Sequence, residues 1–237
     1  MYQGSTLHFG LLIVATIVPL GLVRPVYQRQ NQPGATGLLF MIFGASLYEF
    51  MLMGNIITEN VTLWFITANI SMLATTILTV GWFLLVTEYI GILDIDQQIY
   101  YTITGYTILT QLAVWTHPLH NLAWLRLDSL TGTESFPQAT GLIVSYLSSF
   151  EYLLVFLSLG LLAREAITST GLRQKQAGAI FAGIIPGVVF FLADDVGLVE
   201  IDLTPLGVVG AVLIVTWALL YADFLDIVPI GRQRAVD

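Results

Sequence analysis

The chain has 237 residues, of which 56% are hydrophobic and only 10% are charged. Soluble domains carry roughly 25% charged residues, so a chain this poor in charge is expected to lie in a membrane. The absence of cysteine excludes disulfides, thiol catalysis and cysteine-ligated metals, and the net charge of −8 argues against nucleic acid as a partner. An acidic chain with one lysine is also typical of proteins that work in high salt, so a salt-loving archaeal source is expected.

Seven stretches of the sequence are long and apolar enough to cross a bilayer, which takes about 20 residues of helix. Polar segments and segments with glycine or proline separate them. These stretches are too long and too continuously apolar for the alternating pattern of a β-barrel. The sequence therefore predicts an all-α membrane protein, a seven-transmembrane helix bundle within residues 1–224. In chain order the spans are 6–27, 36–57, 62–90, 98–116, 139–163, 177–193 and 204–224.

The first span, 6–27, has no basic segment before its apolar run and no small-x-small cleavage site after it, so we interpret it as a true span and not a signal peptide. Orientation follows from the basic residues, which favour the cytoplasmic side. With the N-terminus outside, only Arg126 of the eight basic residues lies on the outer side. We expect the N-terminus outside and the C-terminus in the cytoplasm. This orientation places one acidic loop, at 93–96, on the cytoplasmic side, where basic residues are usual.

Glu49 in the second span is the first carboxyl group expected inside the bilayer. Such a group costs a few kcal/mol there, and no basic residue lies at a similar depth in the sequence. We therefore expect an uncharged, hydrogen-bonded side chain. It either lines a ligand pocket or forms an interhelical hydrogen bond worth on the order of 1 kcal/mol. Asn69 and Ser71 of the third span are expected at a similar depth.

The fourth span ends in the sequence AVWTHPLHNLAW, at 113–124. Trp115 suits the aromatic belt at the membrane–water interface, and Pro118 is expected to end the helix. We expect His117 and His120 at the outer surface in a loop cap, with His120 satisfying a free backbone carbonyl. A metal would need further ligands, so no metal site is predicted. A contribution of these histidines to the mouth of a ligand pocket stays open.

The fifth span carries a second intramembrane carboxyl group, Glu151. Ser148 and Tyr152 share its helix face by the i, i+3 and i+4 rule. Polar groups that converge from several helices beneath an aromatic rim are typical of a small-ligand pocket, although packing contacts would give the same pattern. The candidate ligand-binding residues are Glu49, Asn69, Gln111, Trp115, Ser148, Glu151 and Tyr152.

The last two spans add packing signals. Pro186 interrupts the sixth span. Gly207 and Ala211 of the seventh are spaced as small-xxx-small, which allows close helix contact within the bundle or at the seam of a homodimer. The seventh span has no lysine for a retinal Schiff base, and Lys175 lies in a loop. No cofactor is therefore predicted.

Residues 225–237 are predicted to form a cytoplasmic linker to a signalling domain. Pro229 is expected to end the last helix. Asp226 faces water in the short amphipathic segment before it, and Arg232 can reach anionic headgroups. Asp226, Pro229 and Arg232 are therefore the candidate residues for signal output.

Four segments together resemble the N-terminal seven-transmembrane sensor region of histidine kinases. Each is weak alone, but their order and the seven-span layout agree with that family. His117 is a departure, because the family often has asparagine there. The segments are FLLVTEYIG at 83–91, VWTHPLHNLAW at 114–124, RQKQAGAIFAGIIP at 173–186 and the last span with its exit at 201–232.

The resemblance implies a sensor of a two-component system, which passes a small-molecule or physical stimulus across the lipid bilayer to cytoplasmic PAS and kinase domains. No kinase ATP-binding motif and no phospho-accepting histidine is seen in the sequence, so no catalytic residue is predicted. We expect the chain to be the sensor region separated from its kinase. A rhodopsin-like seven-helix protein without the retinal lysine and a small membrane transporter are the alternatives.

Overall fold

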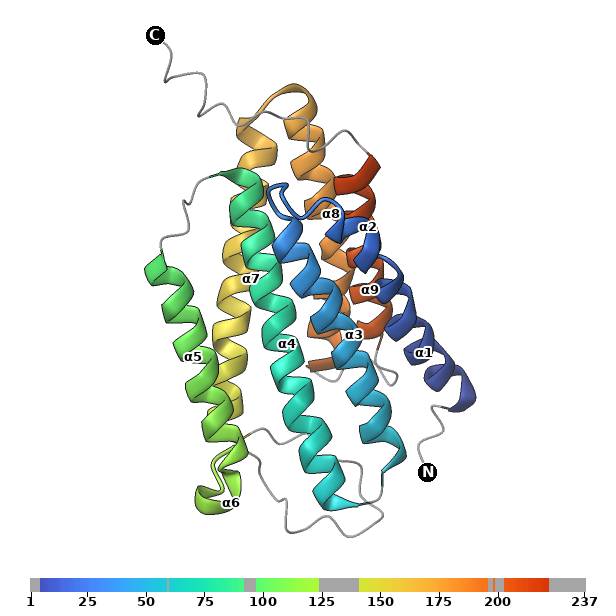
Figure 1. The fold of residues 1–237 in the computed structure, drawn as a ribbon, viewed down its shortest axis with the longest axis vertical. Coiled ribbons are helices and arrows are strands. Elements are labelled where there is room, and N and C mark those ends of the chain that lie inside the picture. Colours follow the sequence, from blue (N-terminus) through green and yellow to red (C-terminus); the bar gives the residue numbers. More distant parts are fainter. Residues whose placement is uncertain are drawn as a thin grey trace.

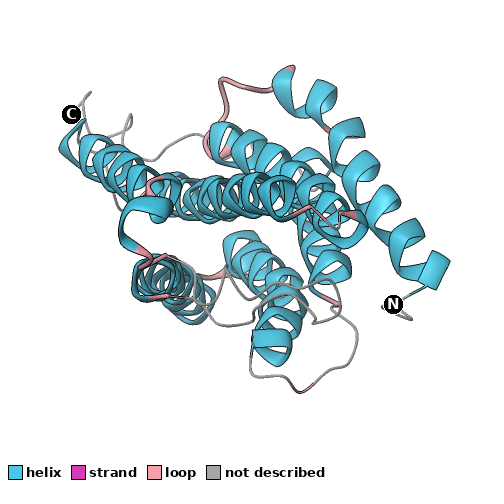
Figure 2. Cartoon of the chain, turned by 90° about the horizontal axis from the view of Figure 1, so that it is seen from below, coloured by secondary structure: helices cyan, strands magenta, loops and turns pink. Residues whose placement is uncertain are grey.

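The computed structural model describes residues 5–58, 60–91, 97–123, 141–195, 198 and 203–221. All regular elements among these residues are helices (Figures 1 and 2), so the predicted all-α fold class is confirmed. The helices are α1 Ser5–Gly21, α2 Val23–Tyr27, α3 Ala35–Ile57, α4 Val61–Ile90, α5 Gln97–Trp115, α6 His117–His120, α7 Leu142–Thr168, α8 Gly171–Asp195 and α9 Thr204–Tyr221.

The long helices lie where the apolar stretches predict them, with one division. The first stretch forms α1 and the short α2, which meet at Leu22. Pro25 has no N–H to donate to the carbonyl four residues earlier, so a continuous α-helix would lose a hydrogen bond at this point. The Leu22 N–H instead bonds to the Pro19 carbonyl oxygen at 2.9 Å, which closes a tighter turn.

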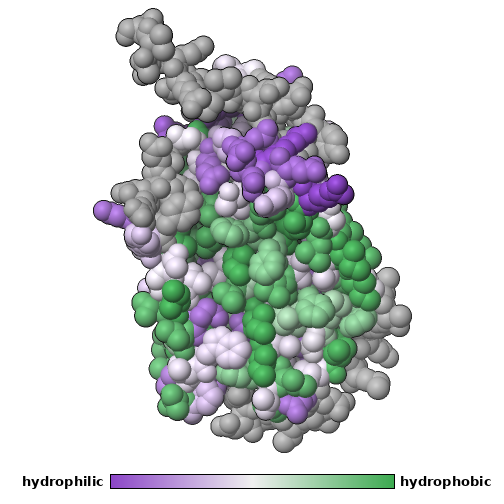
Figure 3. All heavy atoms as spheres, viewed as in Figure 1, coloured by the Kyte–Doolittle hydropathy of each residue, from purple (hydrophilic) through white to green (hydrophobic). Residues whose placement is uncertain are grey.

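Several of these helices can cross a membrane by length and composition. Among the described residues, five long apolar segments qualify, and a shorter apolar helix covers Thr204–Ala218. The surface is hydrophobic over its middle, and hydrophilic side chains gather toward the end where α2 lies (Figure 3). The molecule is a helical membrane bundle, while its orientation stays a prediction. The five segments are His8–Tyr27, Ala35–Ile57, Val61–Ile90, Leu142–Thr168 and Arg173–Ala193.

The long helices α1, α3, α4, α7, α8 and α9 pack side by side in this order, and α9 returns to contact α1. Helix α5 lies at the edge of the bundle against α4 and α7 (Figure 1). Glycines set the closest approaches. A methyl group at Gly44 of α3 would lie 2.5 Å from the Leu78 backbone nitrogen of α4, and one at Gly207 of α9 would lie 2.6 Å from Gly187 Cα of α8. Gly207 therefore packs within the bundle.

Candidate functional site

The polar residues that the sequence analysis singled out on α3 and α4 face the interior of the bundle, as the cost of exposing them to lipid predicts. Glu49 and Asn69 have 0% exposed surface, and Ser71 is also buried. Glu49 continues the face of α3 that carries the buried Ile42 and Ala45. Burial places these side chains inside the protein.

Glu151 of α7 contacts α4 through two threonines that the sequence analysis did not single out. Its Oε1 lies 2.6 Å from Thr76 Oγ1 and 3.5 Å from Thr75 Oγ1. Both hydroxyls also lie 2.9 Å from the Met72 carbonyl oxygen. The Thr76 hydroxyl donates to Glu151 Oε1, and because a hydroxyl group has one proton, it shares this proton with the Met72 carbonyl oxygen. These contacts connect the middle of α7 to α4, and the uncharged carboxyl group stays a prediction.

Replacing Glu151 with leucine is expected to lower the free energy of unfolding by about 1 kcal/mol, because interhelical hydrogen bonds in membranes are worth this much. The loss is modest because the threonine hydroxyls keep the Met72 carbonyl as acceptor. Glu151→Gln retains an oxygen and adds N–H donors, so its unfolding temperature should stay close to that of the unmodified chain. Thermal unfolding in one detergent compares the variants. Equal losses in both would mean that the hydrogen bond to Thr76 contributes nothing.

Tyr152 does not share the surroundings of Glu151. Its ring lies 5.6 Å from that of Phe191 on α8, between centroids, and it also stacks against Phe156. Neighbouring residues on a helix point about 100° apart, so Glu151 faces α4 while Tyr152 faces α8. Ser148 is half-buried. Glu151 and Tyr152, which were predicted to belong to one site, therefore lie at two different helix contacts, α7 with α4 and α7 with α8.

Gln111 of α5 is the least satisfied of the candidate residues. Its side-chain nitrogen and oxygen are both shielded from solvent, and neither has a hydrogen-bond partner among the described residues. On the same helix, Val114 is fully buried and packs with Trp64 and Ala68 of α4 and Val144 of α7. Gln111 thus places a donor and an acceptor where α5 meets these two helices.

The sequence reasoning was wrong about the position of His117. Only 2% of this residue is exposed, and its ring lies 6.1 Å from that of Phe65 on α4. The reason is that Pro118 starts a new turn: α5 ends at Trp115, and α6 begins at His117 with proline in its first turn, where no N–H is needed. Trp115 is 41% exposed and contacts the edge of Phe65.

His120 forms the predicted cap. Its Nε2 lies 2.9 Å from the carbonyl oxygen of Ala113 in the last turn of α5. Its Nδ1 accepts a hydrogen bond from the Leu122 N–H at 3.0 Å. Among the described residues no group of three or more histidine and acidic side chains is arranged to hold a metal ion.

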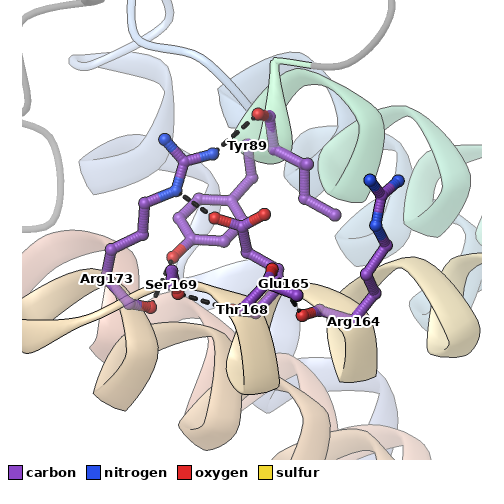
Figure 4. A network of polar contacts seen from close by, with 7 residues as sticks. Tyr89, Arg164, Glu165, Thr168, Ser169 and Arg173 are labelled. Atoms are coloured by element: carbon purple, nitrogen blue, oxygen red, sulfur yellow. Dashed lines mark hydrogen bonds and ion pairs between the residues drawn. The ribbon is translucent and has the colours of Figure 1, made fainter.

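A polar network at the opposite end of the bundle was missed by the sequence reasoning (Figure 4). Arg173 at the start of α8 pairs with Glu165 at the end of α7, and its Nη2 donates to the Ile90 carbonyl oxygen of α4 at 2.8 Å. The Tyr89 hydroxyl lies 3.4 Å from the Arg173 carbonyl oxygen. Two sequence segments could have revealed this network. They are the polar end of α4, TEYIG, and the basic start of α8.

Glu88 extends this connection to α3. Its Oε2 accepts a hydrogen bond from the Gly34 N–H at 2.6 Å. Gly34 precedes α3 and has a φ of 84°, a left-handed conformation that favours glycine. The start of α3 is therefore fixed to the end of α4.

The family model described as the N-terminal 7TM region of histidine kinase matches residues 11–229. Neither the curated proteins nor the solved structures contain a match. The matched range includes α4, α5, α7 and the polar network around Arg173. The candidate output residues Asp226, Pro229 and Arg232 lie outside the residues that the structure describes.

Proposed function

We propose that this chain, which belongs to the family of N-terminal seven-transmembrane regions of histidine kinases, senses a small molecule in the outer half of its bundle. Membership of this family and the apolar helices support a sensor input domain in a membrane. The finer proposal is that the occupied site shifts the helices that lead to cytoplasmic PAS and kinase domains. Asp226, Pro229 and Arg232 would pass that shift on.

The observation that carries the proposal is the amide group of Gln111. A buried polar group without a partner costs about 1–3 kcal/mol, and more where lipid excludes water. Of the described polar side chains at this depth, Glu151 has hydrogen-bond partners on α4, whereas both polar atoms of Gln111 have none. A ligand with one acceptor and one donor would satisfy the amide, and its apolar part would pack where α5 contacts α4 and α7.

The helix arrangement offers a route from this site to the cytoplasmic side. Helix α4 carries Asn69 in its outer half and Thr76 near its middle, and it ends with Glu88 and Ile90. There it is bonded to the start of α3 and to Arg173 of α8. A ligand that favours one position of α5 against α4 would bias two arrangements of the bundle, as a sensor requires.

Replacing Gln111 with leucine is expected to stabilise the chain and to disturb signalling. Removal of an unsatisfied buried amide should raise the free energy of unfolding by about 1 kcal/mol. In the intact kinase, reconstituted in nanodiscs, the same change should alter basal autophosphorylation about fivefold or more, the lower end of usual allosteric couplings. Thermal unfolding and incorporation of labelled phosphate measure the two effects.

The matched control is Gln98→Leu, which makes the same chemical change at an exposed position of α5. It should leave both stability and autophosphorylation unchanged. If Gln111→Leu lowers stability, the amide is satisfied in the folded protein and is not free for a ligand. If it stabilises the chain but phosphorylation stays at the control level, the site is not part of the sensor.

A further inference from the structure

The ring nitrogens of His120 connect the end of α5 to the segment that follows α6. Nε2 lies 2.9 Å from the Ala113 carbonyl oxygen in the last turn of α5. Nδ1 lies 3.0 Å from the backbone nitrogen of Leu122, in the segment that follows α6. Thr116 Oγ1, 3.3 Å from Nε2, itself lies 2.7 Å from the Leu112 carbonyl oxygen.

These partners determine which ring nitrogen carries the proton. The Leu122 N–H can only donate, so Nδ1 must be without a proton and accept. The Ala113 carbonyl can only accept, so Nε2 must carry the proton and donate. Both bonds form together only in the neutral Nε2–H tautomer. A second proton would set an N–H at Nδ1 directly against the N–H of Leu122.

The next residues extend the connection to α7. The Leu122 carbonyl oxygen accepts from the Ile143 N–H at 3.2 Å, and the Ala123 carbonyl oxygen accepts from the Gly141 N–H at 2.9 Å. The first N–H groups of a helix have no partner within it, so these carbonyls satisfy the start of α7. A methyl group at Gly141 would lie 2.2 Å from the Leu122 oxygen, which shows how closely the segments approach.

Few other titratable side chains lie at this end of the bundle among the described residues. His117 of the same short helix faces it, with ring centroids 6.2 Å apart. The described outer parts of α3, α4, α5 and α7, at 50–58, 60–72, 106–116 and 141–150, contain no acidic and no basic residue. Tyr106 and Tyr146 are the titratable residues in these ranges.

We propose that His120 is a proton-sensing site, whose protonation releases the start of α7 from the end of α5. A second ring proton would break the Leu122 bond, and imidazoles as a class change charge between about pH 5 and pH 8. Helix α7 carries Glu151 two turns further on, and its position against α4 would change with its start. The step from this release to a kinase rests on the proposed sensor function, whereas the release of α7 from α5 does not.

The chain has no cysteine, so a pair of spin labels can be placed without background. Leu112→Cys on α5 and Leu142→Cys on α7 suit this purpose, because these residues are 57% and 76% exposed. In lipid nanodiscs, pulsed electron resonance should give one narrow distance at about pH 8 and a longer, broader distribution at about pH 5. No change between these conditions would overturn the proposal.

Two variants assign the effect. His120→Asn keeps an oxygen acceptor for the Leu122 N–H but does not titrate, so its distance should not depend on pH. The distance in His117→Asn should depend on pH as it does in the chain with both histidines. A pH response in the His120 variant, or its loss in the His117 variant, would overturn the assignment. Nitrogen-15 resonances of the unmodified chain at about pH 8 give an independent check, because a proton on Nδ1 of neutral His120 would contradict the proposal.

Discussion

Replacing Gly44 with alanine is expected to lower the free energy of unfolding by about 3 kcal/mol, the upper end of the usual cost of overpacking. The new methyl group would lie 2.5 Å from the Leu78 backbone nitrogen and 2.8 Å from the Ala74 carbonyl oxygen. Both atoms belong to the backbone of α4, which cannot move aside as a flexible side chain can. Because α3 and α4 pack against each other over their length, the helices must separate.

Gly160→Ala of α7 is the matched control, since a methyl group there would meet nothing within 4 Å. Alanine favours helix over glycine by about 1 kcal/mol, so this variant should be neutral or slightly more stable. Thermal unfolding of both variants in one detergent measures the difference. Equal unfolding temperatures would contradict the close packing of α3 on α4, because the same propensity gain applies to both positions.

The long helices could be predicted because the requirement for crossing a bilayer is itself a property of the sequence. The predicted 36–57 and 62–90 correspond to α3 Ala35–Ile57 and α4 Val61–Ile90. The burial of Glu49 followed from the same reasoning, since lipid cannot solvate a carboxyl group. Both predictions use the cost of moving a group from water to lipid and need no knowledge of which helices are neighbours.

Which helix each side chain faces could not be predicted, because this depends on contacts between distant parts of the chain. Glu151 bonds to Thr76, which lies 75 residues earlier, and Tyr152 packs on Phe191 of α8. His117 was expected at the surface, yet the turn at Pro118 directs it toward Phe65. Its neighbour His120 was predicted correctly, because its carbonyl partner lies only seven residues away.

Replacing Arg173 with glutamine is expected to lower the free energy of unfolding by about 2 kcal/mol, the usual worth of a hydrogen bond to a charged group. The Nη2 donor to the Ile90 carbonyl oxygen disappears, although the last carbonyls of α4 lack partners within the helix. A cation at this position also suits the negative end of the helix dipole. Glu165 loses its partner at the same time.

Solvent limits the ion-pair part of this effect, since the Arg173 and Glu165 side chains are 33% and 14% exposed. Arg164→Gln is the control for the loss of charge alone. Arg164 is an exposed arginine at the same end of the bundle (Figure 4), so this variant removes the same charge without removing the bond to Ile90. Its unfolding temperature should stay near that of the unmodified chain. Glu165→Gln completes a double-mutant cycle. If the losses of stability of Glu165→Gln and Arg173→Gln simply add, solvent screens the ion pair, and the loss in Arg173→Gln comes from its bond to the Ile90 carbonyl oxygen.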